Sequence, residues 1–144
     1  MRRRTIRKEK PTGAYHFLAL VDGSDASKMA LQECLKVVDP VKDSVDCCSF
    51  DMGGDAEKLR PVYEAMLSKA KVAHFRFNVI KCDGDIVPVA VTRFFKKEDT
   101  PDYDFIVLGS KGAGVYKKPG PHYLGTVAEK VITCARTNLI LVAK

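Results

Sequence analysis

The chain has 144 residues, of which 46% are hydrophobic and 29% are charged, and a formal net charge of +6. One compact domain fits that length, and the near-average composition excludes a wholly disordered, collagenous or low-complexity chain. No apolar run approaches the roughly 18 residues of a membrane span. The apolar stretch after the basic start is too short for a signal peptide, so we expect a cytoplasmic protein.

The positive charge is concentrated at the amino terminus. Residues 1–10 hold six basic residues and one acidic residue, which leaves a net charge of +1 for the rest of the chain. Pro11 and Gly13 then mark a break before structure begins. We therefore expect a basic, disordered arm over residues 1–13 and a nearly neutral domain over residues 14–144. Any binding to nucleic acid should be weak, salt-dependent and confined to residues 1–10.

The first predicted elements are a strand and an amphipathic helix. Residues 15–21 form a nearly continuous apolar run, which is typical of a strand covered on both faces. Ser24 or Asp25 is suited to cap the helix that follows. Apolar residues recur at helical spacing as far as Val38, and residues 39–40, Asp-Pro, end the helix.

The middle of the chain continues this alternation. Residues 44–50 predict a second strand, and a second helix is expected to begin near Arg60, since Pro61 fits a first helical turn. Residues 75–80 alternate with period two and predict a third strand. A third helix is expected after Asp85.

The last third of the chain predicts a strand, a long loop, a helix and a final strand. These segments are residues 103–108, 109–125, 127–135 and 139–143, respectively. The whole order is βαβαβαβαβ, which predicts an α/β fold: one doubly wound, five-stranded parallel sheet with helices on both faces. Ligands bind such sheets at the carboxyl ends of the strands, where the strand order reverses.

The five cysteines predict core packing and no metal site. They are Cys34, Cys47, Cys48, Cys82 and Cys134. The count is odd, no C-x-x-C occurs, and each cysteine lies in or beside an apolar segment, so we expect reduced thiols in the core. Cys47 and Cys48 should face opposite sides of the sheet.

The loop after the fourth strand is the strongest candidate for a binding site. It contains Gly109, Gly112 and Gly114, and it ends with Gly125-Thr126 at the start of a helix. Glycines let backbone N–H groups approach a phosphate, and a helix N-terminus favours an anion, although such glycines can also serve only the turn. Neither G-x-x-x-x-G-K-[ST] nor G-x-G-x-x-G occurs, which argues against a P-loop and a dinucleotide site.

Three segments together resemble the universal stress protein family. They are Val-Asp-Gly-Ser at 21–24, Asp-Phe-Ile-Val-Leu-Gly-Ser-Lys-Gly at 104–112 and Leu-Gly-Thr-Val-Ala-Glu-Lys-Val at 124–131. The resemblance covers about residues 15–143 and implies the adenine nucleotide alpha hydrolase-like fold with strand order 3-2-1-4-5. Nucleotide-binding members carry G-x2-G-x9-G-[ST]. Here twelve residues separate Gly112 from Gly125, and we expect the three extra residues to bulge outward.

The resemblance also implies a set of nucleotide-binding residues. Asp22 would contact the ribose or a phosphate-bound cation, and the main chain near Val21 and Phe50 would border the adenine. The residues implied to hold ribose and phosphates are Gly109, Gly112, Gly125, Thr126 and Val127. From its residue type alone, Asp22 could equally serve as a helix cap or a turn residue.

Binding is favoured over catalysis. Of the three histidines only His122 lies near the predicted site, and no catalytic triad order is supported. We expect ATP or a related adenine nucleotide, with or without Mg²⁺, as a regulatory ligand in a stress response, with little or no hydrolysis. The alternative is a nucleotide-independent dimeric interaction module of the same fold. An apolar last strand, from Leu139 to Ala143, predicts a homodimer in either case, since an exposed edge favours pairing.

Overall fold

The structure is a computed structural model, and it describes residues 14–109, 126–134 and 138–142. Its elements in chain order are β1 (His16–Leu20), α2 (Asp25–Leu35), β2 (Ser44–Asp51), a short 3-10 helix (Ala56–Leu59), α3 (Arg60–Lys69), β3 (His74–Lys81), α4 (Val87–Lys96), β4 (Phe105–Gly109), α5 (Thr126–Cys134) and β5 (Asn138–Val142). The strands form one parallel sheet in the order β3-β2-β1-β4-β5, which confirms the predicted topology.

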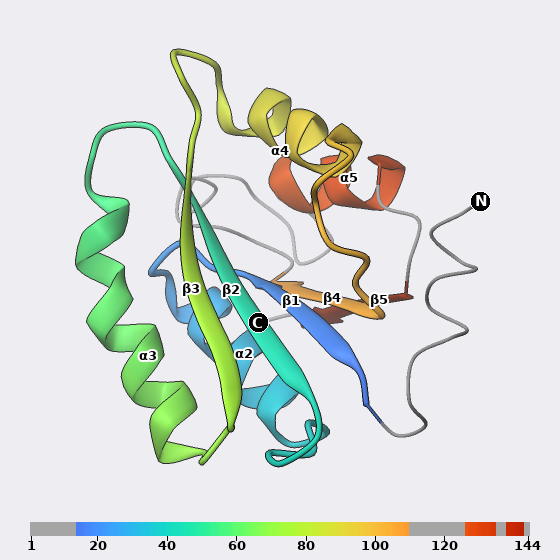
Figure 1. Ribbon diagram of the computed structural model, residues 1–144. Coiled ribbons are helices and arrows are strands. Elements are labelled where there is room, and N and C mark those ends of the chain that lie inside the picture. Colours follow the sequence, from blue (N-terminus) through green and yellow to red (C-terminus); the bar gives the residue numbers. More distant parts are fainter. Residues whose placement is uncertain (1–13, 110–125, 135–137, 143–144) are drawn as a thin grey trace.

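Helices cover both faces of the sheet (Figure 1). One apolar core lies between the sheet and α2 and α3, and includes Leu31, Tyr63 and Leu67. A second core lies on the other face under α4 and α5, and includes Val91 and Val131. Each helix therefore buries its apolar stripe against the sheet, α2 and α3 on one face and α4 and α5 on the other.

The cysteines follow the same division. Cys47 belongs to the α2–α3 core and Cys48 to the α4–α5 core, because successive strand residues face opposite sides. All five cysteines are free thiols; four are buried, and Cys134 is half-buried. Burial raises the pKa of the Cys34 and Cys48 thiols to about 12, so both stay protonated and act as small apolar residues.

Two predicted boundaries were wrong. Helix α2 ends at Leu35 and not at Val38, because the chain tightens there: the N–H groups of Val37 and Val38 both donate to the Cys34 carbonyl. Val38 is nevertheless buried, which explains the helical signal it gave. Strand β4 begins at Phe105 and not at Tyr103, whose hydroxyl instead donates to Asp46 across the sheet.

Two further features concern the described part of the chain. Ser24, not Asp25, caps α2, with its side chain accepting from the Ser27 N–H at 3.1 Å. Within the described ranges, no helix is long and apolar enough to cross a membrane. The predicted arm over residues 1–13 lies outside the described residues.

Candidate functional site

The carboxyl ends of β1 and β4 meet where the strand order reverses. Ala19 of β1 pairs with Val107 of β4, so Val21 and Gly109, each two residues further on, lie at the same level of the sheet. Val21 is buried and its N–H donates to the Cys48 carbonyl at 3.0 Å, which ties it to β2. The structure therefore brings Val21, Asp22 and Gly109 to one edge of the sheet, at a position where doubly wound proteins bind ligands.

The Asp22 side chain takes part in a turn that leads into α2. Its carboxylate accepts from the Ser24 N–H at 2.9 Å and from the Ser24 hydroxyl at 2.5 Å. Gly23 between them has φ +85°, a conformation that favours glycine. Asp22 can hold the turn and also contact a ligand, because a carboxylate that accepts two hydrogen bonds on one oxygen has further lone pairs.

Tyr63 of α3 supports this turn from below, and sequence reasoning missed it. Its hydroxyl accepts from the Gly23 N–H at 3.0 Å and lies 2.5 Å from the Ser27 hydroxyl, which accepts from the Asp22 N–H at 3.2 Å. The side chain is fully buried, and burial raises the pKa of this phenol. In the sequence, Tyr63 is one apolar position of a helical pattern, and its hydroxyl gives no separate signal.

Gly109 lies against the first turn of α2. A Cβ placed on it would come within 3.0 Å of the Ala26 Cβ and 3.1 Å of the Ala26 backbone. Contacts this short are tighter than most Cβ contacts in proteins, so a larger residue at this position would require α2 to move by a few tenths of an ångström. Its role at the site is thus to let α2 approach the end of β4.

The remaining predicted site residues divide into those the structure describes and those it does not. The Phe50 ring is half-buried and packs edge-on against Phe94 of α4, with ring centroids 5.9 Å apart. Thr126 is the first residue of α5, and Val127 packs on the α4–α5 core. Gly112 and Gly125 lie outside the described residues.

A second polar cluster lies at the opposite, amino-terminal edge of the sheet. The Asp46 carboxylate is buried and accepts from Arg76 Nη2 at 2.9 Å and the Tyr103 hydroxyl at 2.8 Å; His16 Nε2 lies 3.1 Å away. Burial raises the pKa of Asp46, but the hydrogen bonds from His16, Arg76 and Tyr103 outweigh it and hold that pKa well below its usual range. Burial and the Asp46 charge together raise the pKa of Tyr103 above its usual range.

The contacts of this Asp46 cluster connect neighbouring strands of the sheet. Its four side chains come from β1, β2, β3 and the segment before β4, and the other three all contact the Asp46 carboxylate. The signal in the sequence was a carboxylate inside an otherwise apolar strand, directly opposite an arginine in the next strand, Arg76. His16 is thereby placed far along β1 from the candidate site.

Solved structures of universal stress proteins have the same fold. UspA from Lactobacillus plantarum aligns with a TM-score of 0.61 at 17% identity, over 89% of this chain and 97% of that chain. A universal stress protein in complex with cAMP aligns with a TM-score of 0.65 at 15% identity, over 89% and 95%. A family member from Burkholderia pseudomallei gives 0.58 at 15%, over 94% and 100%. No protein-family model and no curated protein matches the sequence.

Proposed function

We propose that this chain, whose fold is that of the universal stress proteins, binds ATP or a related adenine nucleotide as a regulatory ligand in a stress response. The site is the carboxyl edge of β1, β2 and β4. Val21 and the main chain of Phe50 border the adenine, and Asp22 contacts the ribose or a phosphate-bound Mg²⁺. The phosphates lie on the loop from Gly109 and at the start of α5.

The observation that carries the proposal is the position of Asp22 and Gly109 at the same reversal of strand order. Asp22 directly follows β1, and Gly109 begins the glycine-bearing loop that leads to Thr126 at the N-terminus of α5. A helix N-terminus after a glycine loop suits a phosphate. The neighbour of this fold in complex with cAMP, itself an adenine nucleotide, is consistent with a nucleotide of this class.

The proposed role is binding with little or no hydrolysis. His16 and His74 lie at the amino-terminal starts of β1 and β3, at the edge opposite the site. In the described part of the chain, no group of three His, Cys, Asp or Glu side chains is placed to hold a metal ion. In the proposal, a bound Mg²⁺ is held by the nucleotide phosphates and Asp22.

The second candidate is a dimeric interaction module that does not bind nucleotide. The observation that favours it is the length of the loop, in which twelve residues and not nine separate Gly112 from Gly125. If the three additional residues displace Gly125, the backbone donors no longer converge on a phosphate.

Calorimetric titration of the full chain with Mg-ATP tests the proposal. We expect saturable heat that is abolished by Gly112→Val or Gly125→Val, because a side chain would block the backbone from the phosphates. Gly53→Ala is the matched control, since a Cβ there meets nothing within 4 Å. The absence of heat at millimolar nucleotide would favour the interaction module. Mass spectrometry of the freshly purified, denatured protein would identify any nucleotide carried through purification.

A further inference from the structure

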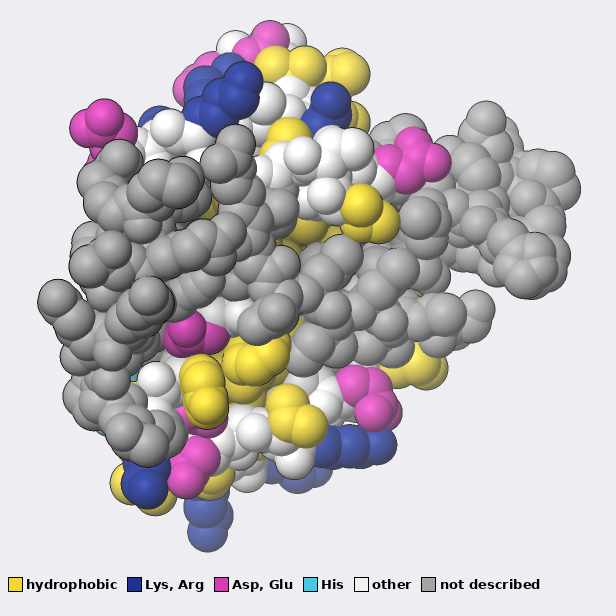
Figure 2. Space-filling model, turned by 90° about the vertical axis from the view of Figure 1, so that its right-hand side faces the viewer, with side chains coloured by type: hydrophobic (Ala, Val, Ile, Leu, Met, Phe, Trp, Pro, Cys, Tyr) yellow, Lys and Arg dark blue, Asp and Glu magenta, His cyan; other side chains and the backbone are white. Residues whose placement is uncertain are grey.

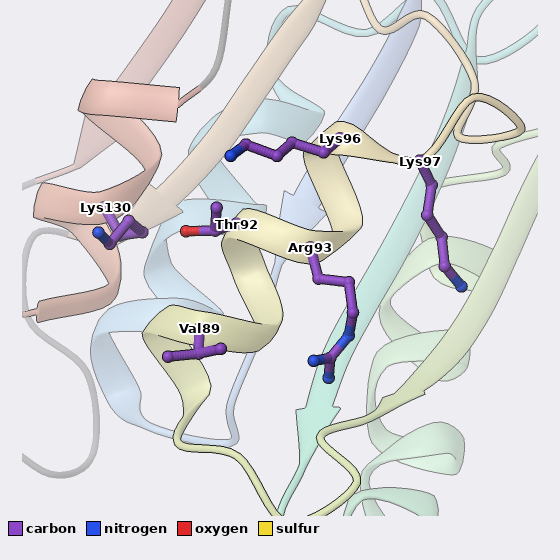
Figure 3. A pocket seen from close by; sticks show the side chains of 6 residues that line it. All are labelled: Val89, Thr92, Arg93, Lys96, Lys97 and Lys130. Atoms are coloured by element: carbon purple, nitrogen blue, oxygen red, sulfur yellow. The ribbon is translucent and has the colours of Figure 1, made fainter.

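A shallow hollow lies between the outer faces of α4 and α5 (Figure 3). Its volume is about 510 Å³, which is in the range of small-molecule sites. It is lined by Val89, Thr92, Arg93, Lys96, Lys97 and Lys130. Four of these six residues are cationic and none is acidic. The helices that form the hollow cover the face of the sheet opposite α2 and α3, so it is separate from the edge that holds the proposed nucleotide site.

The lining residues divide between the two sides of α4. Val89, Thr92 and Lys96 follow one another at helical spacing and form one stripe toward α5. Figure 3 shows Thr92 and Lys96 directed toward Lys130 of α5, whereas Arg93 and Lys97 extend on the other side of α4. The groove between the helices is therefore lined by two lysines, one threonine and one valine.

An acidic side chain neutralises the charge of Arg93, whereas among the described residues none pairs with Lys96 or Lys130, the two lysines of the groove. Arg93 donates to the Asp85 carboxylate at 2.6 Å and to the Cys82 carbonyl at 2.9 Å. Among the described residues, no acidic side chain forms an ion pair with Lys96 or Lys130. Like charges that share a hollow repel each other, and a bound anion would relieve that repulsion.

The chemistry of the groove selects the kind of anion. An ammonium group is a compact charge with three N–H donors, and two such charges in one groove suit the double negative charge of a phosphate better than the single charge of a carboxylate. The Thr92 hydroxyl donates to the Pro88 carbonyl at 3.1 Å and lies 3.5 Å from the Cys134 sulfur, so it lines the groove and leaves the lysines as the donors to the phosphate. Val89 is 45% exposed and offers an apolar wall.

We propose that this α4–α5 groove is a second binding site, for a small organic phosphate whose phosphate lies between Lys96 and Lys130 and whose apolar part rests on Val89. Figure 2 shows Lys and Arg side chains next to hydrophobic ones at the top of the molecule, the level at which Figure 1 places α4 and α5. The proposal does not depend on nucleotide binding at the carboxyl edge of the sheet.

Titration of the isotope-labelled full chain with phenyl phosphate, followed by amide NMR signals, tests the proposal. Above about pH 7 the probe is a dianion. We expect saturable shifts of the Thr92, Lys96 and Lys130 signals, and affinity about tenfold lower in Lys96→Gln and in Lys130→Gln, the loss of one charged hydrogen bond. Phenylacetate, which has the same ring but a carboxylate, should bind more weakly.

The matched control is Lys69→Gln. Lys69 is the last residue of α3 as Lys96 is the last residue of α4, and it is exposed, so its loss removes the same favourable charge from a helix end. Affinity for phenyl phosphate should be unchanged in this variant. The proposal is overturned by shifts no larger than sodium chloride of equal ionic strength produces, by equal affinity for phenylacetate, or by shifts that persist in the Lys96→Gln/Lys130→Gln double variant.

Discussion

Asp46 joins four segments of the chain through one carboxylate. It receives hydrogen bonds from β3 and from Tyr103 before β4, and it contacts His16 of β1. A buried charge is costly when any of these partners is lost, because the group has already left water. The cluster therefore makes the amino-terminal edge of the sheet sensitive to single substitutions.

The first prediction concerns acid stability. The folded pKa of Asp46 lies below the unfolded value of about 3.9, so its stabilisation is fully present above that value and is lost as pH falls through the folded pKa. Asp46→Asn should lower the free energy of unfolding at neutral pH by about 2–3 kcal/mol. Urea unfolding from neutral to acidic pH should show the difference from the unsubstituted chain shrinking below about pH 4. A constant difference down to the lowest pH would contradict this role.

The second prediction separates a positioning hydroxyl from a structural one. Tyr63→Phe removes the acceptor for the Gly23 N–H and loosens the turn that holds Asp22. If the nucleotide proposal is correct, ATP affinity should fall about tenfold, equivalent to one hydrogen bond to a positioned group. Tyr103→Phe is the control: it deletes an equally buried hydroxyl at the opposite edge of the sheet.

The two tyrosine variants are compared by calorimetry with Mg-ATP and by urea unfolding. Both should lose stability, because each leaves a polar group without its partner. Only Tyr63→Phe should lose nucleotide affinity. Equal affinities in the two variants would show that the Tyr63 hydroxyl serves the fold alone.

At the scale of single residues, sequence patterns identified residues of the site but not the long-range hydrogen bonds of buried side chains. Asp22 and Gly109 were identified because a strand end and a glycine loop are local features. Tyr63 and Asp46 were missed because their hydrogen bonds join residues 36 and 57 positions apart in the chain, Ser27 to Tyr63 and Asp46 to Tyr103. No local period carries that information.

At the scale of elements, local hydrogen bonds set both ends of helix α2, and its first turn packs against the end of β4. Ser24 caps its start, and a tight turn on the Cys34 carbonyl ends it. Its first turn lies directly against Gly109, where an added Cβ would be only 3.0 to 3.1 Å from Ala26. The contact between α2 and the end of β4 therefore sets how closely the two sides of the proposed nucleotide site approach each other.

The third prediction tests this contact. Gly109→Ala should lower the free energy of unfolding by about 1–3 kcal/mol, since the new methyl group meets the Ala26 backbone, which cannot move aside as a side chain would. Gly53→Ala, in open space, should change it by less than about 0.5 kcal/mol. Urea unfolding measures both. Similar values for the two variants would mean that α2 shifts without cost.

Element types and order were predictable because each helix and strand carries its own apolar period. The boundaries failed where tertiary contacts extend burial beyond an element. Val38 is buried after α2 has ended, and Tyr103 is buried before β4 begins. A pattern of apolar residues therefore predicts which residues face the core more reliably than it predicts the residue at which a helix or strand ends.

At the scale of the whole molecule, the sheet ends on one side in β5, which among the described residues pairs only with β4. An apolar edge strand presents unpaired backbone groups to a second chain. The fourth prediction is a homodimer formed through residues 139–143. Sedimentation velocity at tens of micromolar should give the mass of two chains. A single 15.9 kDa species at that concentration would contradict it.

The Asp46 cluster also determines how the folded chain fluctuates. Amide hydrogens at the starts of β1, β2 and β3 should exchange with solvent slowest, because opening that edge separates a buried charge from its partners. The turn from Asp22 to Ser24, held by solvent-exposed hydrogen bonds of the Asp22 carboxylate and by a glycine, should open more often. A ligand that binds at this turn should slow amide exchange mainly in the turn itself. Exchange at the amino-terminal edge of the sheet requires global unfolding, so it should report only the change in overall stability.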